Sequence, residues 1–139
     1  MEKQEIKKII TEYLIKKDEI LIAYIFGSFV HKNKFHDIDI AVYLKNDFNK
    51  NDLKKYPYGY ESELISDLTK LVRSKIDFIV INNAGITIQH RIVNKGMLLF
   101  SKDEKFRISF ENYIRKLYID AENIRKIKRK YLVRKINNA

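Results

Sequence analysis

Hydrophobic residues along this chain follow two kinds of spacing, one typical of helices and the other of strands. In four segments apolar residues recur every three or four positions, which predicts amphipathic helices. These segments are residues 2–17, 61–74, 85–95 and 103–132. Four other segments are short runs rich in branched and aromatic residues, which predicts strands. They are residues 20–26, 38–44, 76–81 and 97–100.

The third strand differs from the others because it is apolar on both faces. Residues 76–81 carry one charged side chain, that of Asp77, and this pattern predicts a central strand that is covered on both sides. Gly96 follows the third helix and is expected to end it as a left-handed cap. The last strand, residues 97–100, is expected at an edge of the sheet.

The last helix is longer than a small core can cover. No proline or glycine interrupts residues 103–132, and at about 1.5 Å per residue such a helix reaches some 45 Å. We expect its first half to pack on the sheet and its second half to project, with a role in protein interaction. The alternative is a break near Asn123, after which the helix folds back.

The order of elements predicts an α/β (α+β) fold with a small mixed sheet and helices packed on it. Residues 45–60 are polar and contain the only proline, Pro57, so we expect a connection with at most a short helix. The length predicts a single domain over residues 1–139.

Composition limits the class of protein and points to anionic partners. The chain is 45% hydrophobic and 33% charged, which is typical of a globular protein. The absence of cysteine excludes disulfides and cysteine-ligated zinc. Short apolar runs and a polar N-terminus predict no membrane span and a cytoplasmic location. The net charge of +10 predicts attraction to nucleotides, nucleic acid or acidic protein surfaces.

Candidate chemistry lies between the first two strands. Gly27-Ser28 is followed by Asp37-Ile38-Asp39, and strand alternation places both aspartates on one face. Two neighbouring carboxylates repel each other unless a cation lies between them, and such oxygen ligands suit Mg²⁺ or Mn²⁺. The glycine lets the backbone approach a phosphate closely, and the serine hydroxyl and adjacent N–H groups can donate hydrogen bonds to it. Either fragment alone is also found as a solvated strand or turn, but together they favour a nucleotide site.

Asp77 is the candidate for a third ligand. An aspartate in an apolar strand is costly unless it is paired, solvated or bound to a cation, and this one lies near a strand end. The three histidines, His31, His36 and His90, are too scattered to predict a zinc site. His31 and His36 flank the Gly-Ser segment, where they contact either phosphate or solvent.

These motifs resemble a known family. Residues 26–29, Phe-Gly-Ser-Phe, followed by Asp37-Ile38-Asp39, resemble the signature of the DNA polymerase β-like nucleotidyltransferase superfamily. More narrowly, they resemble the minimal nucleotidyltransferases, including the MntA-like antitoxins that accompany HEPN toxins. Residues 75–81 resemble the third core strand with its acidic residue, and residues 82–100 the helix, glycine and last strand that follow. The loop after Ser28 is shorter than the commonest family spacing.

The resemblance implies a metal-dependent mechanism. In the family, two divalent cations bridge carboxylates and a nucleoside triphosphate, and a hydroxyl attacks the α-phosphorus with loss of pyrophosphate. Asp37, Asp39 and Asp77 would be the catalytic and metal-binding residues here, with Mg²⁺ or Mn²⁺ as the ions. Asp77 would also take the proton of the attacking hydroxyl.

The resemblance also implies which residues bind the nucleotide. Gly27 and Ser28 would orient the β- and γ-phosphates. Lys32 or Lys34 would neutralise phosphate charge, unless they are ordinary surface lysines.

The resemblance to the MntA-like antitoxins implies ATP as donor and a tyrosine of a partner HEPN toxin as acceptor, so that AMPylation silences the toxin. The residues leave three alternatives open. The first is an inactive antitoxin that acts by binding, and the second, which we favour less, is a basic nucleic-acid-binding module. Self-association through the distal helix is also open.

Overall fold

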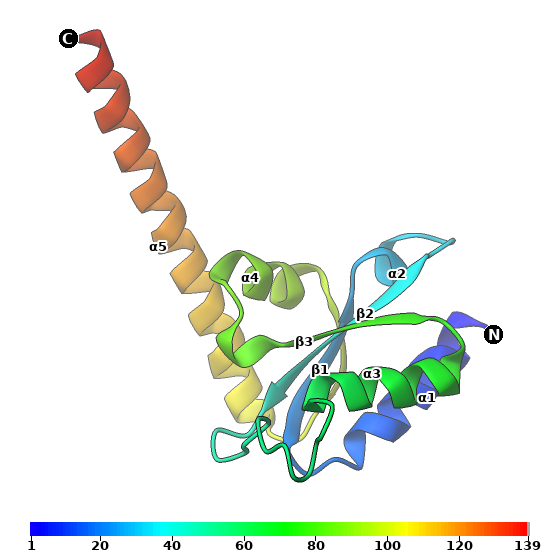
Figure 1. The fold of residues 1–139 in the computed structure, drawn as a ribbon. Helices are drawn as coiled ribbons and strands as arrows, with labels where there is room; N and C mark the ends of the chain where they lie inside the picture. Colours follow the sequence, from blue (N-terminus) through cyan, green and yellow to red (C-terminus); the bar gives the residue numbers. More distant parts are fainter. Residues whose placement is uncertain (139) are drawn as a thin grey trace.

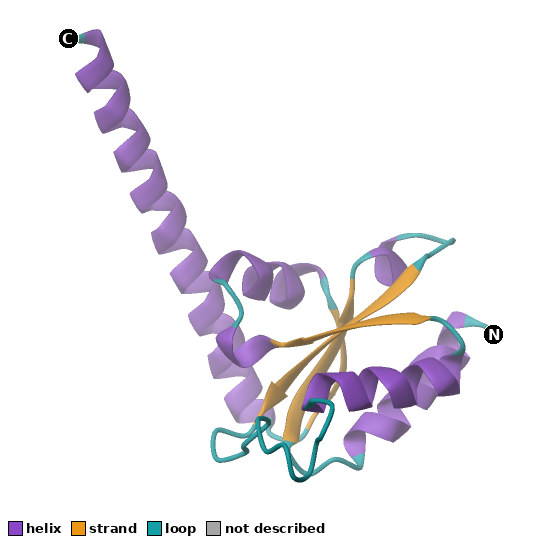
Figure 2. Cartoon of the chain, in the orientation of Figure 1, coloured by secondary structure: helices purple, strands orange, loops and turns teal. Residues whose placement is uncertain are grey.

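The computed structural model describes residues 1–138 and has a four-stranded mixed sheet at its centre (Figures 1 and 2). The strand order is β3-β2-β1-β4. β1 (Ile20–Phe26) pairs antiparallel with both β2 (Asp37–Leu44) and β4 (Met97–Ser101). β2 pairs in parallel with β3 (Lys75–Val80). The C-terminal end of β1 therefore lies beside the N-terminal ends of β2 and β3.

Helices cover both faces of this sheet (Figure 1). One face carries α1 (Lys3–Ile15) and α3 (Tyr60–Val72), and the other carries α4 (Ile86–Lys95) and the first half of α5 (Glu104–Asn137). Two short helices complete the order of elements, which are α2 (Ser28–His31) and the 3₁₀ turn η1 (Ile81–Asn83). The expected mixed sheet with helices and a long C-terminal helix is confirmed, whereas α2 was not predicted.

Strand alternation divides the core into two halves. Ile38, Ile40 and Val42 of β2 are fully buried on the α1 and α3 side of the sheet. Ala41 and Tyr43 lie on the opposite side, in a cluster with Ile22, Tyr24 and Phe26 of β1 and Ile92 of α4. The odd-numbered residues of β2, which include both aspartates, therefore face the α4 and α5 layer.

The central position predicted for the third strand is wrong. β3 lies at an edge of the sheet and pairs only with β2. Its two faces are nevertheless covered, because Phe78 and Val80 pack in the α1 and α3 half of the core and Ile79 packs in the other half. Hydrophobic pattern reports which faces of a strand are buried, and it carries no information about the hydrogen-bonding edge.

The left-handed cap predicted at Gly96 is also wrong. Its backbone is extended, with φ −77° and ψ 171°, and its N–H donates to the carbonyl oxygen of Ile92 at 2.9 Å. A Cβ at Gly96 would lie 2.4 Å from that carbonyl oxygen and 3.3 Å from the carbonyl oxygen of Ile25. Glycine is required here for close backbone approach.

α5 runs without the alternative break near Asn123. The Asp103 carboxylate caps it by accepting the N–H of Phe106 at 3.0 Å. Buried Glu111 anchors its first half to the sheet, because it accepts the Tyr24 hydroxyl of β1 at 2.8 Å and the Arg107 guanidinium at 2.9 Å. The distal half extends away from the sheet, and Ile127 and other apolar residues on it are exposed (Figure 1).

Of the helices in residues 1–138, none is long and apolar enough to cross a membrane.

We predict that Gly96→Ala lowers the free energy of unfolding by roughly 1–3 kcal/mol, because the added methyl group overlaps backbone that cannot easily shift. Thermal denaturation would show a melting temperature lower by about 4 °C per kcal/mol. Gly85→Ala is the matched control, since nothing lies within 4 Å of a Cβ there. A melting temperature of Gly96→Ala equal to that of the control would refute the close-approach explanation.

Candidate active site

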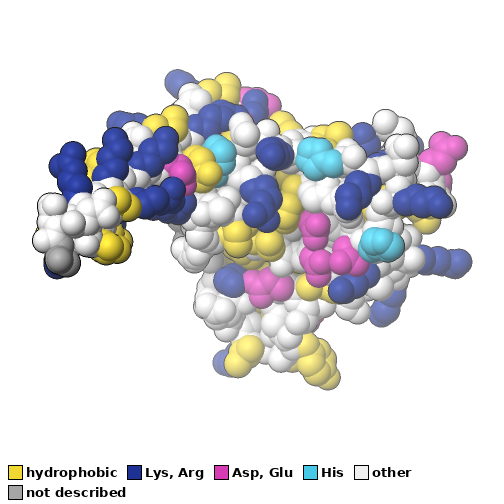
Figure 3. Space-filling view, turned by 90° about the horizontal axis from the view of Figure 1, so that it is seen from above, with side chains coloured by type: hydrophobic (Ala, Val, Ile, Leu, Met, Phe, Trp, Pro, Cys, Tyr) yellow, Lys and Arg dark blue, Asp and Glu magenta, His cyan; other side chains and the backbone are white. Residues whose placement is uncertain are grey.

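The candidate site lies where the end of β1 meets the starts of β2 and β3. Phe26 is the register partner of Asp39, and Asp39 is the register partner of Asp77. Neighbouring residues in a ladder point to the same face, so both carboxyl groups lie on the α4 side of the sheet. Figure 3 shows acidic side chains gathered on one face of the molecule, with basic and histidine side chains around them.

Gly27 allows the chain to turn directly against these carboxyl groups. Its φ is +76°, a value that L-residues with a side chain rarely adopt. A Cβ at this position would lie 2.1 Å from Oδ2 of Asp39. Ser28 begins α2 immediately afterwards, and its hydroxyl donates to the carbonyl oxygen of Asp37 at 3.4 Å. The Gly-Ser turn and the aspartates are therefore parts of one packed unit.

The surroundings of Asp39, including the Asp77 carboxyl group, perturb its ionisation. The pKa of Asp39 is raised to about 6, first because the group is partly buried. A hydrogen bond with the Asp77 carboxyl group and the charges of Asp77 and Asp37 raise it further, while Lys75 opposes the shift. Negative charge on both carboxyl groups at once is therefore disfavoured.

Asp37 occupies a different position. It faces the same side as Asp39, but its register partner is Lys75, and its carboxylate forms an ion pair with the Lys75 ammonium at 3.8 Å. The structure therefore brings Asp39 and Asp77 together and leaves Asp37 beside them with a basic partner.

The carboxyl pair fits a divalent cation by its chemistry. Carboxylate oxygens are the ligands that Mg²⁺ prefers, and a cation would remove the repulsion that now raises the pKa of Asp39. Across residues 1–138, however, no group of three or more His, Cys, Asp or Glu side chains is arranged to hold a metal ion. Asp37, the neighbouring carboxylate, is paired with Lys75.

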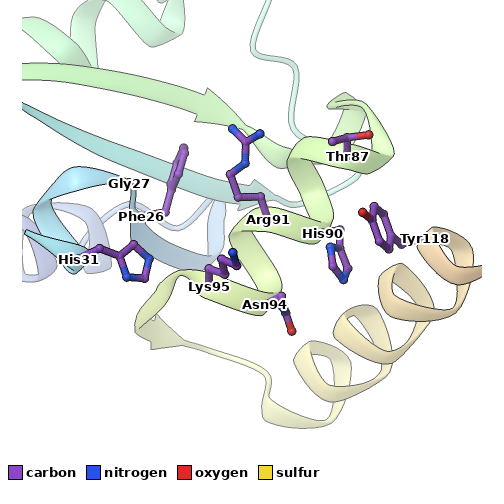
Figure 4. Close-up of a pocket in the computed structure, with 9 residues that line it drawn as sticks. All are labelled: Phe26, Gly27, His31, Thr87, His90, Arg91, Asn94, Lys95 and Tyr118. Atoms are coloured by element: carbon purple, nitrogen blue, oxygen red, sulfur yellow. The ribbon is translucent and has the colours of Figure 1, made fainter. Parts of the chain in front are cut away.

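A cavity of about 450 Å³ opens beside Gly27 (Figure 4). Its lining comes from the end of β1, from α2, from one side of α4 and from α5. The lining residues are Phe26, Gly27, His31, Thr87, His90, Arg91, Asn94, Lys95 and Tyr118. The rings of His90 and Tyr118 are stacked, with centroids 3.7 Å apart. The cavity therefore combines an aromatic wall with cationic side chains.

Of the residues predicted to bind nucleotide, Gly27 lines this cavity and Ser28 follows it in the chain. Lys32 and Lys34 are exposed residues between α2 and β2, and neither lines the cavity. His31 lines it, whereas His36 does not.

The α4 residues in this cavity were not predicted from the sequence. Thr87, Arg91 and Lys95 are spaced by four and so form one stripe of the helix. This stripe was the available signal, but its importance depends on α4 lying next to Gly27.

Several solved structures are similar to this chain at low sequence identity. The crystal structure of the toxin–antitoxin MntA-HepT contains a chain that is 19% identical, with a TM-score of 0.67, covering 88% of this chain and 92% of that one. A tri-AMPylated Shewanella oneidensis HEPN toxin in complex with MNT antitoxin contains one that is 19% identical, with a TM-score of 0.65 and coverage of 86% and 92%. A toxin–antitoxin with AMP-PNP gives 20% identity, a TM-score of 0.63 and coverage of 91% and 94%. These likenesses establish the fold.

No curated protein matches this chain significantly. The family model described as polymerase beta, nucleotidyltransferase matches residues 7–105, which is most of the chain. The matched region contains the Gly-Ser turn and all three aspartates, Asp37, Asp39 and Asp77. The chain belongs to the polymerase β nucleotidyltransferase family.

Proposed function

We propose that this protein transfers AMP from ATP to a hydroxyl group, and that the acceptor is a tyrosine of a partner HEPN toxin in the cytoplasm. The observation that carries the proposal is the Asp39–Asp77 carboxyl pair packed against Gly27 within a nucleotidyltransferase fold. A carboxyl group with a raised pKa next to a cavity, as Asp39 has, is typical of catalytic sites.

Asp39 and Asp77 would hold Mg²⁺, and Asp37 would join them once its ion pair with Lys75 opens. Bound magnesium, as two ions or with Mn²⁺ in its place, would stabilise the charge that develops on the attacking and leaving oxygens. Asp77 would accept the proton of the attacking hydroxyl at a carboxylate oxygen. Gly27 and the Ser28 hydroxyl would orient the phosphates beside them.

The donor and acceptor are supported by the similar structures. One of them contains AMP-PNP, which is an ATP analogue, and another contains an AMPylated HEPN toxin with its MNT antitoxin. The same fold in this chain makes ATP the first donor to test and a HEPN toxin the first acceptor.

A second candidate function is inhibition of the partner by binding alone. The observation that favours it is that, within residues 1–138, no three carboxylates are grouped to hold a metal ion, and Asp37 pairs with Lys75. Incubation with Mg²⁺ and labelled ATP, with and without the partner toxin, separates the two functions. Label on the toxin supports transfer, whereas a tight complex without label supports inhibition by binding.

We predict that Asp39→Asn reduces AMP transfer by about a hundredfold or more. The substitution removes the negative charge that would hold Mg²⁺ at the reacting phosphate, while it keeps the side-chain volume. Label on the toxin per unit time is the measurement. Asp47→Asn, an equal charge change at an exposed position on the loop after β2, is the control and should retain wild-type activity. Equal activities of the two variants would reject the metal-binding assignment.

We predict that Gly27→Ala reduces transfer by at least about tenfold and destabilises the fold by roughly 1–2 kcal/mol. The new methyl group would displace the Asp39 carboxyl group, and φ +76° is strained for alanine. Transfer and thermal denaturation are measured together. Gly85→Ala should change neither by much, because its φ is −63° and the space around it is empty.

We predict a pH dependence of stability in the absence of divalent cations. Because the folded state raises the pKa of Asp39 to about 6, it binds more protons than the unfolded state between about pH 4 and 6. This contribution to stability is full below pH 4 and is lost as the pH rises through 6. Melting temperatures in EDTA should show the loss in the wild type and not in Asp39→Asn. An identical pH profile for both proteins would contradict the carboxyl-pair assignment.

A further inference from the structure

The end of α4 is held next to Gly27 by the backbone. Gly96 follows Lys95, and its missing side chain lets the chain pass close to the carbonyl oxygen of Ile25. The next residue, Met97, is the register partner of Ile25 in β1. Lys95 precedes Met97 by two residues, and Gly27 follows Ile25 by two residues. The Ile25–Met97 pair therefore brings Lys95 and Gly27 to the same end of the sheet.

Two cations project from this part of α4. Figure 4 shows Arg91 and Lys95 on the side of the helix that faces Phe26 and Gly27, while His90 points towards Tyr118 of α5. Within residues 1–138, no carboxylate lies within 4.0 Å of the Arg91 guanidinium or the Lys95 ammonium. The cavity thus holds two positive charges that no acidic side chain compensates.

Acidic groups also lie beside Gly27. The Asp39 carboxyl group lies against this glycine, with Asp77 hydrogen-bonded to it. A ligand bound at Gly27 therefore has both carboxyl groups and the two cations of the cavity near it. A nucleoside triphosphate has a matching arrangement, because its α-phosphate reacts at the metal-binding carboxylates and its β- and γ-phosphates carry most of the remaining charge.

We infer that Arg91 and Lys95 bind the β- and γ-phosphates of a nucleoside triphosphate in the cavity beside Gly27. This inference rests on the proposed function for the nature of the ligand. The planar guanidinium of Arg91 suits two parallel hydrogen bonds to phosphate oxygens, and the Lys95 ammonium supplies a compact charge. The role resembles the one predicted for Lys32 and Lys34, but α4 supplies the cations.

The test is equilibrium binding of ATP, AMP and inorganic tripolyphosphate to the full chain by calorimetry, without any acceptor. The variant Arg91→Met/Lys95→Met should bind ATP and tripolyphosphate at least about tenfold more weakly than the wild type, and AMP within about threefold. Both side chains are exposed, so the variant should melt as the wild type does. Arg91→Lys, which keeps the charge, should recover most of the ATP affinity.

Lys54→Met/Lys55→Met is the matched control, because it also removes two positive charges, at exposed positions in the loop before α3. It should bind ATP as the wild type does. Equal losses in this control would show a general charge effect and overturn the assignment. A larger loss of ATP affinity in Lys32→Met/Lys34→Met than in the α4 variant would also overturn it, as would equal losses for AMP and ATP.

The inference and the proposed function fail in different ways. If the wild type binds neither ATP nor tripolyphosphate at millimolar concentration, the inference is wrong. If the α4 variant loses ATP affinity but the wild type labels no partner, the binding site stands and the proposed transfer falls. If the wild type labels its partner and the α4 variant binds ATP normally, the transfer stands and the binding site is overturned.

Discussion

The close contact between Gly27 and the Asp39 carboxyl group is the constraint on which the rest of the site depends. The carboxyl group occupies the volume that a side chain at position 27 would need. Only glycine allows β1 to end there with a positive φ, so that α2 begins at once. Strand pairing keeps the end of β1 beside β2, and the register of β2 with β3 brings Asp77 next to Asp39.

This arrangement is electrostatically unfavourable without a cation. Partial burial and the neighbouring Asp77 and Asp37 carboxyl groups raise the pKa of Asp39 to about 6, and a bound cation would remove this repulsion. Local instability of this kind is common where a protein binds a charged ligand, because the surrounding fold supplies the stability that the site lacks. Here the buried strands β1 and β2 supply it.

The sequence predicted the faces of the sheet better than its edges. Alternation in residues 38–44 correctly assigned Ile38 and Ile40 to the core and Asp39 to the opposite face. The same reasoning misplaced β3, because burial of both faces is compatible with an edge strand. The aspartates were chosen as candidate site residues because their positions in the sequence resemble a family motif. The pairing of Asp39 with Asp77 depends on strand register, which a hydrophobic pattern does not report.

The α4 part of the site could not be predicted in the same way. Arg91 and Lys95 are exposed polar residues on an amphipathic helix, where such residues usually face solvent. Their position follows from Gly96 and from the pairing of Met97 with Ile25, and both are long-range properties. Lys32 and Lys34 were chosen instead because they are close to the motif in the chain, but proximity in sequence does not bring them into the cavity.

α5 joins two distant regions in one rigid element. Tyr118 in its first half is a wall of the cavity through its stack with His90, and the same helix continues to Asn137 with exposed apolar residues such as Ile127 and Ile136. A protein that binds the distal end of α5 and tilts this helix would therefore also move Tyr118 in the cavity wall. If that protein changes the affinity of the cavity for a ligand, the ligand must change the affinity of α5 for the protein by the same factor.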